Sequence, residues 1–367
     1  MSSTSTPSVL HVTTGLEIGG GEVLLLNLAE AAQRRGLNST VVSLIADGPM
    51  RQRIRAAGIP LHTLGMRRGV PSLSGVAKLV RLIREIKPDV VQGWLYHGTI
   101  AATVALALSG RWRQTVLIHG IYGSSIDFGA YGRRVRLGFR LAAFASRFAD
   151  AAVYNTEAGA EWHGAQGFRS RRVRVIENGI DPTRFEATSG LRESVRGELG
   201  LDETETVAIV IARVDPMKGW DRLLRVTERV PGLRLLAVGT GTEAFPPHPS
   251  RIPLGPREDV PSLLAAADLF ILPSLFGEGT SVALTEAMAA GLPVVVTDVG
   301  DNARIAAGCG RIVAPEDEAG LEQAIGDLAA DPTARAAFGA AARTRARETC
   351  SIDAMLDAYY RLYREAA

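Results

Sequence analysis

Lysine is nearly absent from this chain. Its 367 residues carry 41 basic side chains, and only Lys78, Lys87 and Lys218 among them are lysines. Because arginine is the default cation here, an ordinary surface site would have been filled by arginine. Lys218 stands in the stretch ARVDPMKGWDRLL, five residues after Arg213. We therefore expect Lys218 to occupy a site that requires a compact ammonium group.

Cysteine and long apolar runs are scarce as well. The two cysteines, Cys309 and Cys350, have neither metal-binding nor redox spacing, which fits a reducing compartment. The start, MSSTSTPSVLHVT, lacks the features of a signal peptide, and the longest apolar stretch, around residues 99–108, is too short to span a bilayer. The sequence therefore predicts a soluble cytoplasmic protein, with the inner face of the cell membrane as its one expected membrane contact.

Two ligand signatures are missing. No Asp-x-Asp motif occurs, so we expect no metal-bridged diphosphate, no metal site and no other cofactor. The segment VGTGTEA, at 238–244, matches a dinucleotide fingerprint, but prolines follow it where that fingerprint needs a helix. An NAD site is therefore rejected.

Charge is divided unevenly between the halves. Up to residue 180 there are 22 Lys and Arg residues against 11 Asp and Glu, and from residue 181 the numbers are 19 and 28. Halves of opposite sign indicate two domains with different partners, and the basic half is expected to meet something anionic. No nucleic-acid partner is predicted.

Both halves alternate short apolar runs with helical stretches, as parallel α/β layers do. We expect one Rossmann-like domain at 1–180, a second at 181–350, and a closing amphipathic helix at 351–367. Ligands of such sheets bind beyond the carboxyl ends of the strands, so two facing units predict a cleft between them. The expected strands are SVLHVT, STVVSLI, DVVQG, TVLIHG, AAVYNT, TVAIVIA, RLLAVG, DLFILP, PVVVTD and GRIVA, and the expected helices include 22–35, 75–87, 97–109, 219–230, 259–267 and 281–290.

Two clusters in the second half suit a phosphorylated sugar ligand. Arg213 and Lys218 follow the apolar run AIVIA, and an arginine fork with a lysine point charge can hold a diphosphate. In LFGEGTSVALTEAMAAGLPVVVTD, Thr280 or Ser281 can cap a helix whose free amides make an anion site. Glu278 precedes that helix and Glu286 lies inside it, so the two carboxylates can face groups on either side of a phosphate. The alternatives are a solvated pair of cations and an exposed glutamate on a capped helix.

These stretches resemble the donor site of family-4 glycosyltransferases, which are retaining enzymes of GT-B fold. The family pattern is an Arg, a Lys-Gly five residues later, and a Glu-x7-Glu pair leading into Glu-Ala-Met-Ala-x-Gly-x-Pro-Val-Val. NGID at 178–181, LGPREDVPSLLAAADLFILPS at 254–274 and the glycine-rich GLEIGGGE also fit. The resemblance covers nearly the whole chain and is most specific over 205–315. It implies an α/β, GT-B fold of two Rossmann-like domains facing across a cleft, with the final helix packed back on the N-terminal domain.

The resemblance also implies roles for residues. Arg213 and Lys218 would bind the donor diphosphate and stabilise the departing nucleoside diphosphate, Glu278 would contact the transferred sugar, and Glu286 the ribose. The segment Leu254–Arg257 would meet the base. The expected donor-binding set is Gly20, Gly21, Arg213, Lys218, Gly239, Arg257, Glu278, Gly279, Thr280, Ser281 and Glu286, and the expected catalytic set is His119, Arg213, Lys218 and Glu278.

Residues of the first half are expected to complete the site. His119 is taken to end the strand TVLIH and to face the cleft near the reacting sugar, where family members carry a His-Gly. The glycines 19–21 let the backbone approach a ligand ahead of a helix. The alternatives are a structural histidine and a simple tight turn. The expected acceptor contacts are His97, Tyr122 and Asn178.

The segment RRVRLGFRLAAFASRF, at 133–148, indicates a further partner. On a helix, four of its arginines fall within about 60° of one another, beside a stripe formed by Leu137, Leu141, Phe144 and Phe148. Such a surface can lie on anionic lipid, which would suit a lipid-linked acceptor. The alternative is a stripe that packs on its own domain.

The sequence as a whole predicts a metal-independent, retaining glycosyltransferase of the hexosyltransferase type. It would move a sugar from a UDP- or GDP-linked donor to an acceptor hydroxyl on a lipid-linked or cell-surface polysaccharide precursor. Two alternatives stay open, a nucleotide-sugar epimerase of the same architecture and a non-catalytic nucleotide-sugar-binding protein.

Overall fold

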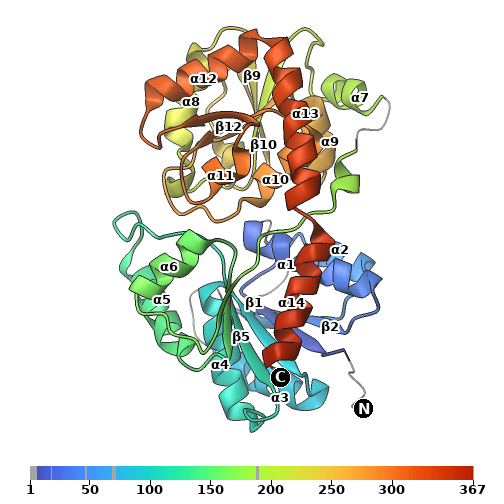
Figure 1. Cartoon of the computed structure of the whole chain (residues 1–367), viewed down its shortest axis with the longest axis vertical. Helices are drawn as coiled ribbons and strands as arrows, with labels where there is room; N and C mark the ends of the chain where they lie inside the picture. The colour runs from blue at the N-terminus through green and yellow to red at the C-terminus, as the bar shows by residue number, and fades with distance from the viewer. Residues whose placement is uncertain (1–5, 18, 46–47, 68–71, 187–189, 367) are drawn as a thin grey trace. The chain divides into compact units, whose positions relative to one another are not determined.

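The chain divides into two compact units. The computed structural model describes residues 6–17, 19–45, 48–67, 72–186 and 190–366. Unit 1 consists of Met1–Gly179 together with Ile352–Ala367, and unit 2 of Ile180–Ser351. The chain therefore leaves unit 1 once and returns to it, and the closing helix lies among the early elements of that unit (Figure 1).

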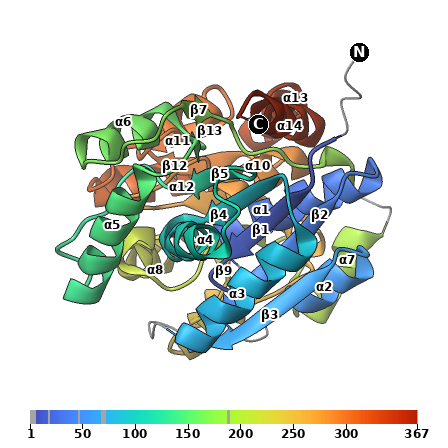
Figure 2. The ribbon, with the colours of Figure 1, turned by 90° about the horizontal axis from the view of Figure 1, so that it is seen from below.

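Unit 1 is built on a seven-stranded parallel sheet with the order β3-β2-β1-β4-β5-β6-β7. Continuous apolar runs form its central strands because helices cover both faces of such a sheet. The strands are β1 (Val9–Thr13), β2 (Ser39–Ile45), β3 (Leu61–Met66), β4 (Val90–Trp94), β5 (Val116–Ile121), β6 (Ala151–Tyr154) and β7 (Val173–Val175). The helices are α1 (Gly20–Arg34), α2 (Arg51–Ala56), α3 (Leu73–Ile86), α4 (Leu95–Ser109), α5 (Arg133–Ser146), α6 (Glu157–Ala165) and α14 (Ile352–Ala366) (Figure 2).

Unit 2 is built on a six-stranded parallel sheet with the order β10-β9-β8-β11-β12-β13. Its strands are β8 (Thr206–Ile211), β9 (Leu233–Val238), β10 (Arg251–Gly255), β11 (Leu269–Leu272), β12 (Val294–Thr297) and β13 (Gly310–Val313). Its helices are α7 (Leu191–Glu198), α8 (Trp220–Arg229), α9 (Val260–Ala266), α10 (Val282–Ala290), α11 (Asn302–Ala306), α12 (Glu318–Ala330) and α13 (Pro332–Thr349). Two apolar clusters, one on each face of the sheet, form the core.

Helix α14 is fastened to the sheet of unit 1 by aromatic and polar side chains. The hydroxyl of Tyr363 donates to the side-chain oxygen of Gln92 on β4, and the hydroxyls of Tyr359 and Tyr122 lie 2.8 Å apart. The Trp94 ring stacks on that of Tyr122, with centroids 5.0 Å apart. The helix is therefore an integral part of unit 1 rather than an appendage.

Candidate functional site

The candidate donor site of unit 2 lies where the order of its strands reverses. The first strand, β8, is flanked by β9 on one side and β11 on the other. The chain continues from β8 to β9 and from β11 to β12, so the connections of these two neighbouring strands run in opposite directions. In parallel sheets this reversal opens a crevice at the carboxyl edge, where ligands bind. Arg213 and Lys218 follow β8, and Glu278 follows β11. The topology thus brings the two predicted clusters to the two sides of one crevice.

The loop after β8 depends on two glycines that approach neighbouring backbone closely. Gly219 has a φ of 65°, and a Cβ there would lie 2.5 Å from the carbonyl oxygen of Pro273. Gly239 has a φ of 132°, and its Cβ would lie 2.2 Å from the carbonyl oxygen of Ala212. Only glycine satisfies both the backbone conformation and the space at these two positions. As a result, helix α8 begins directly beside the end of β11.

Lys218 and Glu278 meet in this structure. The Lys218 ammonium forms an ion pair with Oε1 of Glu278, and the hydroxyl of Ser274 donates to the same oxygen. The side chains of Lys218 and Glu278 are 14% and 6% exposed, so little water screens the pair. The confined position explains a compact ammonium at residue 218, because one oxygen is shared by two donors.

Arg213 lies on the same loop and is more accessible. Its guanidinium forms an ion pair with Asp215 at 3.1 Å and is 51% exposed. Its carbonyl oxygen accepts a hydrogen bond of 3.0 Å from the indole nitrogen of Trp220, the first residue of α8. The backbone of this arginine is thereby fixed, while its guanidinium can exchange Asp215 for another anion.

Helix α10 supplies the second half of the crevice. The hydroxyl of Ser281 accepts from the amide of Leu284 at 3.4 Å, so Ser281, one of the two expected caps, is the N-cap. Gly279 and Thr280 are buried in the approach to the helix. Glu286, on the helix itself, is only 9% exposed, which excludes the freely solvated glutamate considered above.

The remaining expected donor contacts follow β9 and β10. The amide of Gly239 donates to the carbonyl of Gly255 at 2.8 Å, which ties the two strand ends together. Arg257 forms an ion pair with Asp259 at 2.5 Å, and its guanidinium lowers the pKa of that carboxyl. These residues belong to the same edge of the sheet as Arg213.

Unit 1 shows a similar arrangement at the reversal between β1 and β4. Gly20 and Gly21 open α1 after β1, and His97 is exposed in the first turn of α4 after β4. Leu95 begins α4 with a φ of 57°, a strained conformation for a branched side chain. A Cβ on Gly21 would lie 3.3 Å from the Leu95 side chain, so the two loops are in contact.

His119 requires a correction. The strand β5 does not end at this residue but continues to Ile121, and the His119 side chain is fully buried. Its Nε2 lies 2.9 Å from the hydroxyl of Thr103 on α4, and burial lowers its pKa to about 3. The ring has no exposed surface from which to touch a substrate, so we remove His119 from the catalytic set.

Two expected acceptor contacts are also engaged elsewhere. The Tyr122 hydroxyl is 2.8 Å from that of Tyr359, and its ring stacks on Trp94, so Tyr122 holds α14 in place. Asn178 is buried, with 3% of its surface exposed. Of the three expected residues, His97 alone is exposed.

Sequence reasoning missed two residues that shape the site. Ser274 orients the Glu278 carboxylate, and Asp215 both pairs with Arg213 and accepts from the amide of Met217 at 3.0 Å. Both are small polar residues just beyond a strand end, which is the one signal that could have marked them.

Two further observations concern metals and membranes. Among the residues that the structure describes, no three His, Cys, Asp or Glu side chains are grouped so as to hold a metal ion. Metal independence stays a prediction. Over the same part of the chain, no helix has both the length and the apolarity needed to cross a bilayer.

Two family profiles match the chain. The profile described as Glycosyltransferase Family 4 matches residues 18–184. The profile described as Glycosyl transferases group 1 matches residues 205–331. Between them they reach into both units.

Curated relatives match over part of the chain. A D-inositol 3-phosphate glycosyltransferase from Mycobacterium sp. (strain KMS) is 33% identical over 172 residues, which are 41% of this chain and 38% of that protein. A GDP-mannose-dependent alpha-(1-6)-phosphatidylinositol monomannoside mannosyltransferase from Mycolicibacterium smegmatis is 31% identical over 197 residues, 47% of this chain and 51% of that protein. The chain thus spans 38% and 51% of the length of these two relatives.

Solved structures match over nearly the whole chain. Anabaena Alr3699/HepE in complex with UDP and glucose superposes with a TM-score of 0.85, covering 98% of this chain and 100% of that chain at 21% identity. Sucrose-phosphate synthase from Thermosynechococcus elongatus superposes with a TM-score of 0.78, covering 98% of each chain at 16% identity. The fold and the family expected from the sequence are both confirmed: the chain belongs to glycosyltransferase family 4 and has the GT-B fold.

Proposed function

We propose that this chain transfers a sugar from a nucleoside diphosphate sugar to an acceptor hydroxyl, without a metal ion and with retention of anomeric configuration. The observation that carries the proposal is the meeting of Lys218 and Glu278 at the strand-order reversal of unit 2, with the Arg213 guanidinium on the same loop. Two cations beside a carboxylate suit a diphosphate that carries a hydroxylated sugar. Retention is inferred from the family.

The ion pair suggests how the site responds to its donor. In the free protein the Lys218 ammonium is bound to Glu278. A donor diphosphate competes for that ammonium, and once Lys218 turns to the phosphates, Glu278 is released to accept a hydrogen bond from a sugar hydroxyl. Ser274 keeps the carboxylate oriented during the exchange.

The same cations serve the chemical step. As the bond between the sugar and the diphosphate breaks, negative charge grows on the leaving nucleoside diphosphate. Lys218 and Arg213 stabilise that charge, which is the electrostatic form of catalysis. The first turn of α10 directs backbone amides at a phosphate, while Glu286, Gly239 and Arg257 are assigned to the nucleoside.

The classes of donor and acceptor are proposed from the relatives. One relative is named for D-inositol 3-phosphate, another for GDP-mannose and a phosphatidylinositol monomannoside, and a structural neighbour was solved with UDP and glucose. We propose a UDP- or GDP-linked hexose as donor and a lipid-linked or cell-surface glycan precursor as acceptor. Neither cysteine of the chain is in a disulfide, which supports a cytoplasmic site of action.

The first experiment measures thermal stabilisation of the purified protein by UDP, GDP, ADP and NAD, each with EDTA present. A ligand at roughly 100 times its dissociation constant adds about 2.7 kcal/mol to the free energy of unfolding, so binding is visible as a raised melting temperature. We expect one nucleoside diphosphate to raise it in the wild type. The shift should be lost in Lys218→Ala and in Arg213→Ala, and kept in Lys78→Ala, which removes an exposed lysine of α3.

Transfer to an acceptor is the second measurement, with the anomeric product identified by NMR. Loss of transfer in folded Glu278→Ala and Lys218→Ala would support the assignment, and full activity in both would refute it. A donor that is isomerised with no acceptor present would identify an epimerase instead. Binding without turnover on any acceptor would identify a nucleotide-sugar-binding protein.

A further inference from the structure

Exposed apolar side chains of this protein are concentrated in one region. Of the twelve large hydrophobic side chains exposed among the described residues, eight lie between residues 104 and 148. Soluble proteins rarely expose apolar residues in such a concentration unless the surface contacts something. The eight are Val104, Leu108, Trp112, Val135, Leu137, Leu141, Phe144 and Phe148.

Helix α5 shows which of its faces is covered. Its buried residues, Phe139, Ala142, Ala143, Ala145 and Ser146, centre on one side of the helix at 100° per residue, and Phe139 packs into an aromatic cluster of unit 1. Leu137, Leu141 and Phe144 point away from that side, and Phe148 follows in the turn after the helix. The apolar stripe predicted from the sequence therefore does not pack on its own unit. Leu137 is 59% exposed and Phe144 58% exposed.

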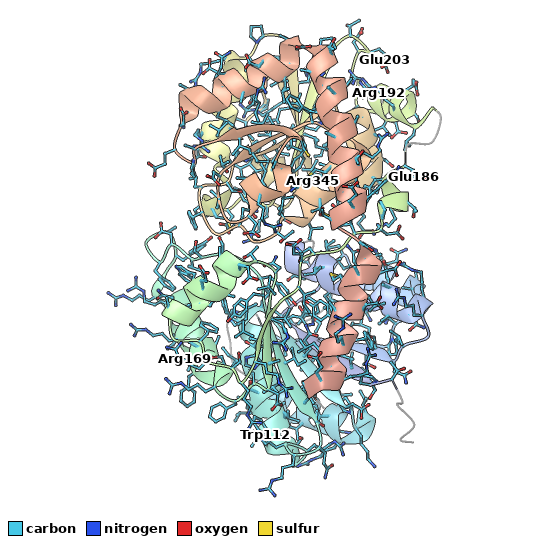
Figure 3. All side chains as sticks on the ribbon, in the orientation of Figure 1. Trp112, Arg169, Glu186, Arg192, Glu203 and Arg345 are labelled. Atoms are coloured by element: carbon cyan, nitrogen blue, oxygen red, sulfur yellow. The ribbon has the colours of Figure 1, made fainter. Side chains whose placement is uncertain are left out.

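The stripe continues onto the end of the neighbouring helix. Helices α4 and α5 pack side by side (Figure 2). The centre of the Phe148 ring lies 5.5 Å from the centre of the Phe144 ring and 6.3 Å from that of the Trp112 ring. Trp112 follows α4 at the surface of unit 1 (Figure 3). We name these five residues the α5 patch: Trp112, Leu137, Leu141, Phe144 and Phe148.

The surroundings of the α5 patch are basic. Between residues 104 and 148 the chain has seven arginines and a single acidic residue, Asp127. The guanidinium of Arg147 lies 5.9 Å from the centre of the Phe144 ring, so cation and aromatic group are presented together. The arginines are Arg111, Arg113, Arg133, Arg134, Arg136, Arg140 and Arg147.

Charge decides which occupant fits. A second copy of the chain, related by a two-fold axis, would set this patch against itself and bring arginines against arginines, which is unfavourable. A polar anionic ligand would satisfy the arginines but leave the leucines in water. An anionic bilayer offers phosphates to the arginines and acyl chains to the apolar side chains in one plane.

We propose that the α5 patch is a membrane-docking surface, on which the apolar side chains enter the headgroup region of an anionic bilayer and the arginines bind its phosphates. Docking goes beyond the proposed sugar transfer and does not depend on it. Arginine side chains suit this role because their apolar stems can lie along the interface while the guanidinium stays at the headgroups.

The test is sedimentation of the full chain with vesicles, without donor or acceptor. One set is pure phosphatidylcholine, and the other contains about one third phosphatidylglycerol. We expect binding to the anionic vesicles that weakens with salt. Leu141→Asp/Phe144→Asp should weaken it at least tenfold, roughly the effect of keeping one large apolar side chain in water. Arg140→Ala should weaken it about fivefold.

Two controls separate docking from folding. Leu73→Asp places the same substitution at an apolar residue that is 92% exposed and outside the α5 patch, and it should bind like the wild type. Trp112 is the exposed tryptophan among the described residues, since Trp94 and Trp220 are buried and Trp162 is half-buried, so comparing the wild type with Trp112→Phe isolates its contribution to the emission. Anionic vesicles should shift the tryptophan emission to shorter wavelength, and Trp112→Phe should remove most of that shift.

Three results would overturn the proposal. The first is no binding to anionic vesicles at low salt. The second is equal binding by the wild type and Leu141→Asp/Phe144→Asp. The third is a wild-type dimer in solution that becomes monomeric in this double variant. Transfer to a water-soluble acceptor should be unchanged in the patch variants, so failure of docking and failure of the proposed enzymatic function give different results.

Discussion

Lys218 and Glu278 form an ion pair that is largely shielded from water, with side chains 14% and 6% exposed. Removing one partner of such a pair leaves the other as an unpaired charge with little water around it. Replacing both partners by neutral side chains lowers the free energy of unfolding much less. The pair of Arg213 and Asp215, on the same loop, has a guanidinium that is 51% exposed and therefore makes a natural comparison. Exposed pairs contribute little to stability.

We therefore predict that Lys218→Ala lowers the free energy of unfolding by about 3 kcal/mol. Lys218→Ala/Glu278→Gln should recover most of this loss, and Arg213→Ala should cost less than about 1 kcal/mol. Urea unfolding of the wild type, the single variants and the double variant gives the coupling energy. Strictly additive effects would show that the two side chains do not interact in solution.

At the scale of single residues, the sequence predicts where a side chain lies along a strand better than it predicts which side chains it contacts. The residues that follow a strand can be read from the end of an apolar run, which is why Lys218 and Glu278 were expected at one edge. His119 was misplaced because Gly120 resembles a strand end, although β5 continues to Ile121. Its buried ring contacts Thr103, a residue of another element, and no local pattern encodes that contact.

Among the secondary-structure elements, α14 shows how a helix distant in sequence becomes part of a sheet's covering layer. Its tyrosines place hydroxyls over β4 and β5, where Gln92 is fully buried and accepts from Tyr363. A buried acceptor that loses its donor retains the full cost of its desolvation.

Tyr363→Phe should therefore lower the free energy of unfolding by about 1 to 3 kcal/mol, because it leaves the Gln92 oxygen without that donor. Arg361→Ala, at an exposed position of the same helix, serves as the control and should change stability by less than about 0.5 kcal/mol. Guanidinium unfolding followed by circular dichroism measures both. A Tyr363→Phe protein as stable as the wild type would mean that water or another group replaces the tyrosine.

The strands that sequence reasoning missed share one property. β3, β7 and β10 each lie at an edge of a sheet, and their residues are mostly half-buried or exposed. The central strands were found because they are covered on both faces and need unbroken apolar runs. An edge strand is covered less, so its sequence can be polar. The fourth edge strand, β13, was nevertheless predicted, as part of GRIVA.

On the scale of the whole molecule, the buried histidines with lowered pKa values are divided unevenly between the two units. Burial lowers the pKa of His11 to about 3, of His119 to about 3 and of His163 to about 4, and all three belong to unit 1. Each is neutral in the folded protein but takes up a proton in the unfolded chain below about pH 6.5. Protons therefore favour the unfolded state of unit 1 as the pH falls from 6.5 towards the folded pKa values.

Unit 1 should accordingly lose stability on acidification before unit 2 does. Below pH 6.5 each of the three histidines lowers the free energy of unfolding of unit 1 by about 1.4 kcal/mol per pH unit. Hydrogen exchange read by mass spectrometry between pH 7 and about 5, corrected for intrinsic rates, should show the faster loss of protection in the peptides of unit 1. The exposed His248 provides the control, and His248→Gln should change nothing. Earlier opening of unit 2 would contradict this account.

Unit 1 is made from two separated pieces of the chain, whereas unit 2 is one continuous piece, Ile180–Ser351. A ribosome therefore releases all of unit 2 before α14 leaves the exit tunnel. Until that helix arrives, Trp94, Gln92 and Tyr122 lack the tyrosines that cover them. The half of the protein that is synthesised first is thus completed last, and in the interval it presents an apolar sheet face that a chaperone can bind.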